Sequence, residues 1–310
     1  MTRQGGVDRR GLGFALAGLL ATPRLGQAQG SAIRVGSKID TEAALLGNLV
    51  VQALRTAGLT VEPRLALGPT RIVRGALLAG EIDLYPEYTG NGAYFFERLE
   101  DPAWRESQAG YELVARLDRE ANNLVWLDRA RANNTWAIAV RGDVAQRESL
   151  RTLEQFFVAA TAGKLRLAAS AEFVESPVAL PAFERAYGAT FPRDRITVLP
   201  GGDTAVTMRA AAQGLSGVNA AMVYGTDGAI EPLGLVVMED NKRAQIVYEP
   251  APVVRAATLE RLPAIRTALA PVFASLSQEK LRQLNGQIAV EGRTPEAVAR
   301  AHLAGLGSAR

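Results

Sequence analysis

From Ser31 onward the chain alternates between short runs of β-branched and apolar residues and longer runs with apolar residues at helical spacing. The first such series predicts strands at 33–37, 61–67 and 82–86 and helices at 41–58 and 70–80. Asp40 or Thr41 is positioned to cap the first of these helices. The β-α-β-α-β order predicts a largely parallel sheet with helices on its faces, because parallel neighbours need crossover connections.

A second series of the same kind follows the first. It predicts strands at 135–140, 165–170, 196–200, 219–225 and 235–240, and helices at 180–187 and 203–213. After Tyr248 the sequence is rich in Ala and Leu and predicts helices near 258–275, 277–285 and 295–304. Two α/β units without a low-complexity linker predict two lobes around a cleft, where ligands lie beyond the carboxyl ends of the strands.

The N-terminal segment has the order of a cleavable export signal. Arg9 and Arg10 precede an apolar stretch at 11–21, and the small residues Gly26 and Ala28 offer a cleavage site after Ala28. The stretch is shorter than the roughly 20 apolar residues that a membrane-spanning helix needs. We therefore predict a signal peptide at residues 1–28 and a soluble mature protein in the periplasm.

Composition excludes several classes of function. The chain has no Cys, which excludes disulfides, thiol nucleophiles and Cys-ligated metal centres. Its single histidine, His302, lies in an Ala-rich helical pattern near the C-terminus, so a Ser–His–Asp triad is not expected. The net charge of +3 comes from residues 1–28, which hold four Arg against one Asp. The mature chain is therefore neutral and offers no basic excess for nucleic acid.

Aromatic residues make up only 6% of the chain, yet several stand next to predicted strands, where a cleft is expected. They are Tyr85, Tyr88, Trp136, Tyr224 and Tyr248. Aromatic rings that converge on one cleft can hold a cation that donates no hydrogen bonds, such as a quaternary ammonium. Position alone favours ordinary core or surface packing over this interpretation.

Several long sequence runs resemble one family. VGSKIDTEAALLGN (35–48), GEIDLYPEYTGNG (80–92), ANNTWAIAV (132–140), GTDG (225–228) and APVVR (251–255) resemble the osmoprotectant-binding proteins of ABC importers, which take glycine betaine, choline or carnitine. ALPAFERAYG, SGVNAAM and PVFASL resemble in particular its YehZ subgroup of low-affinity glycine-betaine-binding proteins. The resemblance covers essentially the whole mature chain. It implies an α/β, two-lobed type II periplasmic binding protein fold with a ligand cleft between the lobes.

The resemblance also implies a ligand-binding site. The positions that match the family's aromatic box are Tyr88, Trp136, Tyr224 and Tyr248. Asn134 stands where a backbone carbonyl or an acid approaches the ammonium, so here only a carbonyl dipole is expected. Lys38 matches a contact to the ligand carboxylate, and Asn91 keeps a side-chain donor where relatives often have Thr.

One position departs from the family pattern. Relatives place an Arg that grips the ligand carboxylate three residues after a Phe, whereas Phe173 is followed at that distance by Ser176. A charge-assisted contact is worth about 1.5–3 kcal/mol. We therefore hypothesise that this protein binds betaine weakly or prefers a cation without a carboxylate, such as choline.

The expected protein is a non-enzymatic binding protein, a monomer that docks on an ABC permease in the inner membrane and needs no cofactor or metal. Lobe one is expected to hold residues 31–136 and 243–310, and lobe two residues 137–242, with closure across strands near 136–140 and 238–246. Two alternatives stay open: the same fold with another small amine or an amino acid as ligand, and an exported hydrolase with paired carboxylates.

Overall fold

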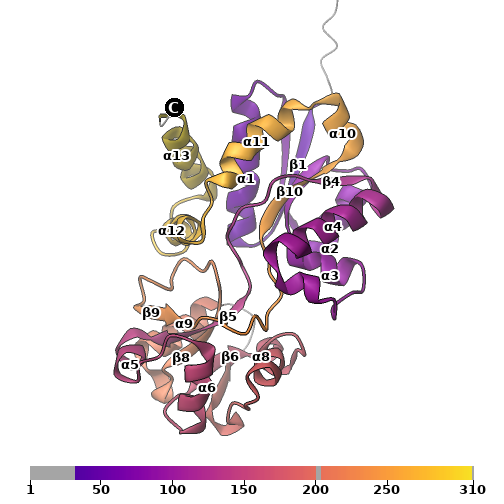
Figure 1. The fold of residues 1–310 in the computed structure, drawn as a ribbon. Coiled ribbons are helices and arrows are strands. Elements are labelled where there is room, and N and C mark those ends of the chain that lie inside the picture. Colours follow the sequence, from indigo (N-terminus) through magenta and orange to yellow (C-terminus); the bar gives the residue numbers. More distant parts are fainter. Residues whose placement is uncertain (1–31, 200–203, 309–310) are drawn as a thin grey trace, which may run out of the picture. The chain divides into compact units, whose positions relative to one another are not determined.

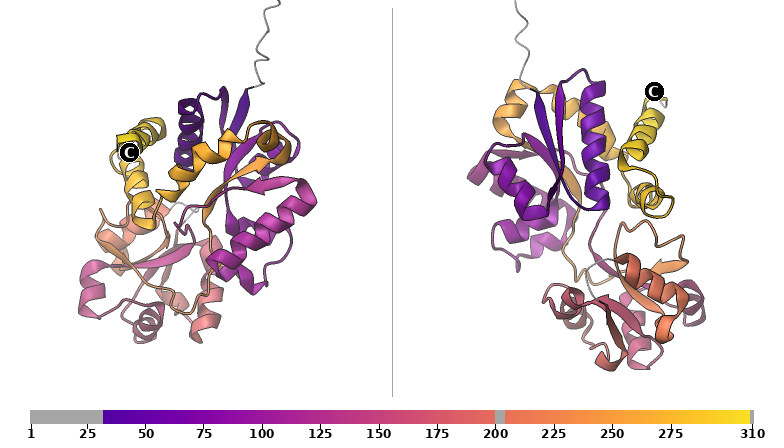
Figure 2. Two further views of the ribbon diagram at one scale, coloured as in Figure 1. Left: turned by 45° about the horizontal axis from the view of Figure 1, so that its top comes forward. Right: turned by 180° about the vertical axis from the view of Figure 1, so that it is seen from behind.

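The computed structural model describes residues 32–199 and 204–308. The described residues belong to one compact unit. The predicted signal peptide at 1–28 lies outside the described residues. Within the compact unit the strands form two five-stranded sheets (Figures 1 and 2).

The first sheet has the strand order β2-β1-β3-β10-β4. Its strands are β1 (Ile33–Lys38), β2 (Val61–Gly68), β3 (Leu84–Tyr88), β4 (Leu124–Trp126) and β10 (Pro250–Arg255). The helices of this part are α1 (Thr41–Thr56), α2 (Thr70–Leu78), α3 (Gly92–Phe95), α4 (Ser107–Asn122), α10 (Ala256–Arg261), α11 (Ala264–Ala274), α12 (Gln278–Ala289) and α13 (Pro295–Ser308).

The second sheet has the order β7-β6-β8-β5-β9. Its strands are β5 (Trp136–Arg141), β6 (Leu167–Ser170), β7 (Ile196–Leu199), β8 (Ala220–Tyr224) and β9 (Leu235–Val237). The helices of this part are α5 (Gly142–Arg147), α6 (Leu153–Thr161), α7 (Ala171–Glu175), α8 (Leu180–Tyr187) and α9 (Thr204–Gln213). Short 3₁₀ turns lie at Thr89–Asn91, Pro102–Arg105, Arg193–Arg195 and Leu215–Gly217.

The parallel arrangement predicted for the first three strands is confirmed, and each sheet also contains one strand that runs against the others. In the first sheet β1 pairs in parallel with β2 and β3, but β10 runs antiparallel between β3 and β4. In the second sheet β6 pairs in parallel with β7 and β8, and β5 runs antiparallel to β8 and β9. Strands β5 and β10 are the antiparallel ones. The chain reaches each of them directly from the other sheet, so no helical crossover connects them to a parallel neighbour.

Helix α1 shows why these sequences fold as they do. Asp40 caps it by accepting a 2.9 Å hydrogen bond from the backbone N–H of Ala43. Its apolar residues at helical spacing are buried on the first sheet and against α11 and α13. The β1–α1 turn therefore holds the start of α1 at the carboxyl end of β1.

Two chain segments connect the sheets and lie against each other. The backbone N–H of Asn134 donates to the carbonyl of Tyr248 at 2.9 Å, and Thr135 Oγ1 donates to the carbonyl of Ile246 at 2.7 Å. The chain crosses at 127–135 and at 238–249, between the strands of the two sheets. The predicted crossover at 136–140 is wrong, because that run is strand β5, paired on both sides within the second sheet.

Candidate functional site

A cavity of about 1520 Å³ is lined by residues from both sheets and from their helices. Lys38, Tyr88, Asn91, Asn134, Trp136, Tyr224 and Tyr248 are among its lining residues. The structure thus brings seven of the eight sequence-predicted site residues to one cavity. Pockets for small ligands commonly measure about 300–1,000 Å³, so this cavity has room for a small osmolyte together with water.

Trp136 and Tyr224 form a stacked pair because of strand register. They are direct partners in the antiparallel β5–β8 ladder, so their side chains lie on the same face of the sheet. Their ring centroids are 4.5 Å apart with an interplanar angle of 30°, and Phe173 packs on Trp136 at 5.5 Å. Phe173 thereby fixes the orientation of an indole that lines the cavity.

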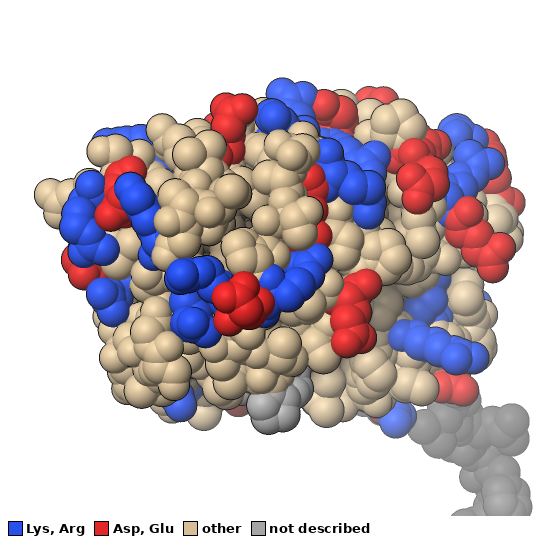
Figure 3. All heavy atoms as spheres, turned by 90° about the horizontal axis from the view of Figure 1, so that it is seen from below, with Lys and Arg blue, Asp and Glu red and all other residues tan. Residues whose placement is uncertain are grey.

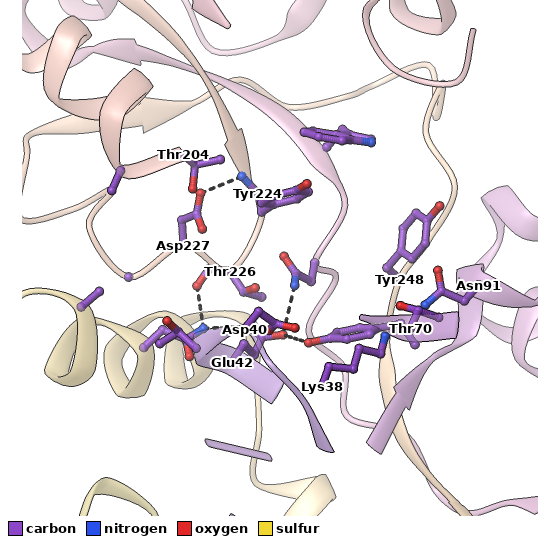
Figure 4. A pocket seen from close by; sticks show the side chains of 18 of the residues that line it. Lys38, Asp40, Glu42, Thr70, Asn91, Thr204, Tyr224, Thr226, Asp227 and Tyr248 are labelled. Carbon is purple, nitrogen blue, oxygen red and sulfur yellow. Dashed lines mark hydrogen bonds between the residues drawn. The ribbon is translucent and has the colours of Figure 1, made fainter. Parts of the chain in front are cut away.

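Tyr248 is seated by a glycine in the turn after β3. An ideal Cβ at Gly90 would lie 2.7 Å from a ring carbon of Tyr248, so the ring rests directly on the Gly90 backbone. The backbone of Tyr248 is held by Asn133, whose Oδ1 accepts its N–H at 2.7 Å. Figure 4 shows Tyr248 and Tyr224 as two separate walls of the pocket.

Tyr88 ends strand β3 and has a cation of the protein at its ring. Lys38 Nζ lies 4.5 Å from the ring centroid of Tyr88, a cation–π distance. The same Nζ lies 2.5 Å from Glu87 Oε1, with both side chains almost completely buried. One face of Tyr88 is therefore already used inside the protein.

Glu87 engages both Lys38, which the resemblance assigns to the ligand carboxylate, and Asn91, which is expected to keep a side-chain donor. Asn91 Nδ2 donates to Glu87 Oε1 at 2.7 Å, and Lys38 Nζ donates to the same oxygen. Tyr85 donates its hydroxyl to Glu87 Oε2 at 2.8 Å, and the backbone N–H of Tyr88 donates to Oε1 at 2.7 Å. Lys38 and Asn91 thus line the cavity with their charge and amide turned toward an internal carboxylate.

Glu42 is a functional candidate that sequence reasoning missed. Its Oε1 accepts hydrogen bonds from the Tyr88 hydroxyl at 2.7 Å and from Asn134 Nδ2 at 3.2 Å. Its Oε2 accepts one from Asn285 Nδ2 at 2.6 Å. The acid that can stand at position 134 in the family is replaced by Asn134 in this chain. The side-chain amide of Asn134 instead donates a hydrogen bond to Glu42, an acid of α1.

A sequence signal for Glu42 was present. Glu42, Leu46, Leu49 and Ala53 follow one another at helical spacing, so the acid occupies the buried stripe of α1. Acids are common in the first turn of a helix, because the helix dipole favours them. The sequence therefore does not distinguish Glu42 from an ordinary exposed acid at a helix start. Among the described residues its side chain is one of the few buried carboxyls that lines the cavity.

Burial raises the pKa of the Glu42 carboxyl to about 7, against the opposing effect of hydrogen bonds from Thr226, Tyr88 and Asn285. Two amide oxygens next to it, Asn134 Oδ1 and Asn285 Oδ1, are buried without a hydrogen-bond partner. Buried polar atoms are normally satisfied, so an unpartnered pair beside a cavity marks a place where a ligand or water completes the contacts.

Ser176 is the predicted site residue that the structure does not place on the cavity wall. It follows α7, it is partly buried, and its backbone N–H donates to the carbonyl of Glu172 at 2.9 Å. Glu172 itself lines the cavity, as do the acids Asp40 and Asp227. The opposing cation Arg74 is engaged by Asp118 at 2.5 and 2.8 Å.

Comparisons with known proteins point to one family. Residues 31–305 match OpuAC, described as the substrate binding domain of ABC-type glycine betaine transport system. The chain is 51% identical over 286 residues to the glycine betaine-binding protein YehZ of Escherichia coli, covering 92% of this chain and 94% of that protein. It is 32% identical over 297 residues to a glycine-betaine-binding protein of Pseudomonas aeruginosa, covering 94% and 92%. The solved apo structure of E. coli YehZ matches with a TM-score of 0.81 at 52% identity, over 89% of this chain and 99% of that one.

Proposed function

The chain belongs to the family of substrate-binding domains of ABC-type glycine betaine transport systems, and on this premise we propose that it binds a quaternary ammonium osmolyte in the aromatic-lined cavity. The predicted α/β fold of the periplasmic binding proteins is confirmed by the likeness to the apo YehZ structure. As a substrate-binding protein of an ABC transporter, it is extracytoplasmic and serves a permease. The ligand class is glycine betaine or choline.

The stacked Trp136–Tyr224 pair is the observation that supports this site most. A quaternary ammonium donates no classical hydrogen bond, so ring faces and nearby negative charge are what can hold it. Tyr88 and Tyr248 line the same cavity, and the buried carboxyl of Glu42 supplies the negative charge behind Tyr88 and Asn134. Each cation–π contact contributes about 0.5–2 kcal/mol when the cation is desolvated.

Binding is proposed to close two lobes around the ligand. Lobe one is residues 31–136 with 243–310, and lobe two is residues 137–242, as expected from the sequence. The paired crossover segments 127–135 and 238–249 are the proposed hinge, because they connect the sheets and hydrogen-bond to each other. A ligand that contacts walls from both sheets favours the closed state by its difference in affinity for the two states.

We propose that the protein is no enzyme, that it is a periplasmic monomer without cofactor, and that residues 1–28 are its export signal. His302 Nε2 lies 2.8 Å from Ser275 Oγ and is not among the described residues that line the cavity. In the described part of the chain no helix is both long and apolar enough to cross a membrane.

The face of the molecule drawn in Figure 3 shows no continuous basic patch. On the face drawn in Figure 3, Lys and Arg side chains are interspersed with Asp and Glu. Nucleic-acid binding relies on a continuous basic patch or stripe. The absence of a nucleic-acid partner therefore stays part of the proposal.

Isothermal titration of residues 29–310 with glycine betaine and with choline tests the proposed function. We expect at least one of them to bind, and Trp136→Ala to abolish that binding. Trp136→Phe is the matched variant, because it keeps a smaller aromatic face and should weaken binding without removing it. Unchanged binding in Trp136→Ala contradicts the aromatic site. No binding of either ligand up to tens of millimolar contradicts the ligand class and directs the search to other amines.

A further inference from the structure

Resting on the proposed function, we propose that Glu42 determines the charge selectivity of the cavity: its ionised carboxylate favours a ligand with a net positive charge, such as choline, over a zwitterion. Both ligands present the same trimethylammonium group, so their discrimination depends on what the protein offers to the rest of the molecule. Glu42 lines the cavity from the first turn of α1, and it is 6% exposed.

Arg71 of α2 and Arg209 of α9 also line the cavity, but the two expected donors are paired inside the protein. Lys38 and Asn91 both donate to Glu87 Oε1, and Glu87 is fully buried. The position where relatives have an Arg is Ser176, away from the cavity wall. A zwitterion that places its carboxylate next to Lys38 and Asn91 therefore desolvates it against donors that are already paired, which costs binding free energy.

Glu42 adds a negative charge at a place where only an ammonium benefits from it. Asn134 and Asn285 turn their amide N–H groups to Glu42 and leave their oxygens unpartnered. These two oxygens and the carboxylate give this wall of the cavity a negative potential. A cation gains from that potential, whereas in a zwitterion the attraction of the ammonium is offset by repulsion of the carboxylate.

Charged and polar groups face Glu42 from several of the elements packed around it. Lys38 ends β1, Asp40 precedes α1, and Tyr88 ends β3. The turn after β8 contributes Thr226 and Asp227, and α12 contributes the neutral amide of Asn285. Asp40 opposes ionisation of Glu42 by like charge, which acts in the same direction as burial.

The proposal couples ligand binding to a proton. Because the pKa of Glu42 is raised to about 7, a fraction of the molecules holds a neutral Glu42 near neutral pH. A bound cation stabilises the ionised form, so binding of choline releases a proton, up to about three quarters of one at pH 6.5. A zwitterion releases less, because its two charges act on Glu42 in opposite senses. The ratio of choline affinity to betaine affinity therefore rises with pH between about 6 and 8.

The test is calorimetric titration of residues 29–310, Glu42→Gln and Glu296→Gln with choline and with glycine betaine. Glu296 is the matched control, since it is the second residue of α13 as Glu42 is of α1, and its side chain is 62% exposed. We expect the choline-to-betaine affinity ratio to fall about tenfold or more in Glu42→Gln and to stay within twofold in Glu296→Gln. An unchanged ratio in Glu42→Gln overturns the proposal.

Proton release can also be measured on the unmodified protein, so this test does not depend on the folding of a variant. At pH 6.5 the binding heat of choline should differ between two buffers of different ionisation enthalpy. The difference equals the number of protons released multiplied by the difference in ionisation enthalpy, and it should be smaller for betaine. Equal heats in both buffers for choline overturn the proposal while leaving the proposed function in place. Absence of binding by either ligand overturns both, and loss of binding in Trp136→Ala with an unchanged ratio in Glu42→Gln overturns only the role of Glu42.

Discussion

Glu42 occupies a position that the buried stripe of a helix normally gives to an apolar residue. Its neighbours along the stripe, Leu46 and Leu49, are fully buried in the core of the first sheet. A carboxylate in such a place loses hydration and regains only part of it through amide and hydroxyl donors. Placing it there lowers the stability of the folded chain and creates negative potential at the cavity.

We predict that Glu42→Gln changes the pH dependence of folding. The pKa of Glu42 is raised by burial from 4.5 to about 7, so between these values the folded state binds a proton that the unfolded state has lost. Stability therefore falls as pH rises from about 4.5 to 7, by about 3 kcal/mol from this one group. Urea unfolding of Glu42→Gln should lack this fall and show a gain over the unmodified protein at pH 8 relative to pH 5.

Glu296→Gln is the control, because its exposed carboxyl should leave the pH profile of unfolding unchanged. A parallel pH profile for Glu42→Gln and the unmodified protein would show that Glu42 titrates normally. In that case burial would not raise the pKa of Glu42.

A second prediction concerns Ser176. Ser176→Arg should strengthen binding of betaine more than binding of choline, because it restores a charged donor for the ligand carboxylate. A charge-assisted contact of about 1.5–3 kcal/mol corresponds to roughly 10–150-fold in affinity. Titration of both ligands checks it, and equal gains for the two would contradict the carboxylate role of this position.

At the residue scale, the sequence located the aromatic positions better than the polar ones. Tyr88, Trp136 and Tyr224 end or begin strands, so their place at the cavity follows from strand order and register. Glu87 could not be assigned to Lys38 from the sequence, because the two meet only through neighbouring strands 49 residues apart. Partners of this kind depend on packing that periodicity does not encode.

At the element scale, helix α12 is packed tightly against the turn that follows β8. Gln278 Nε2 and Arg282 Nε donate to the carbonyl of Gly225, at 2.5 and 2.8 Å, and Asn285 donates to the carbonyl of Thr226 at 3.0 Å. A Cβ at Gly228 would lie 2.1 Å from the backbone nitrogen of Gly286. This backbone contact connects the C-terminal helices with the second sheet.

We predict that Gly228→Ala destabilises the protein by about 1–3 kcal/mol, because backbone atoms of α12 must move to admit the methyl group. Urea unfolding is the measurement. Gly305→Ala is the control: it lies in α13 with nothing within 4 Å of an added Cβ, so it should leave stability unchanged or raise it by up to about 1 kcal/mol. Equal stability of the Gly228 variant and the unmodified protein would contradict the tight contact.

Most strands and helices were predictable from periodicity, and the exceptions have physical causes. The strand predicted at 82–86 lies at Leu84–Tyr88, because the paired register with β10 extends past Pro86. Strand β10 itself was missed, since the two prolines of PAPVVR argue against a strand that pairs on both sides. The single helix predicted at 258–275 is divided into α10 and α11 at Pro263.

At the scale of the whole molecule, the walls of the cavity come from two sheets joined by two segments. Helix α2 lines it from the first part and α9 from the second. We propose that a ligand shifts an equilibrium between open and closed lobes without changing either sheet. The assignment of the lobes to 31–136 with 243–310 and to 137–242 is testable as rigid-body motion.

We predict that choline or betaine shortens the distance between spin labels on α2 and α9. Because the chain has no Cys, Ile72→Cys and Val206→Cys give a labelled pair without background, and both side chains are exposed. The pair Val158→Cys and Val206→Cys, both within 137–242, should keep its distance. A change in the second pair, or none in the first at saturating ligand, would contradict closure of two rigid lobes.

A crystal structure of residues 29–310 grown with saturating choline would locate the ligand directly. We expect the trimethylammonium group within about 6 Å of the ring centroids of Trp136 and Tyr224, on the cavity side of Tyr248 and beside Glu42. A ligand bound elsewhere on the molecule, or a cavity without ligand at saturating concentration, would contradict this expectation.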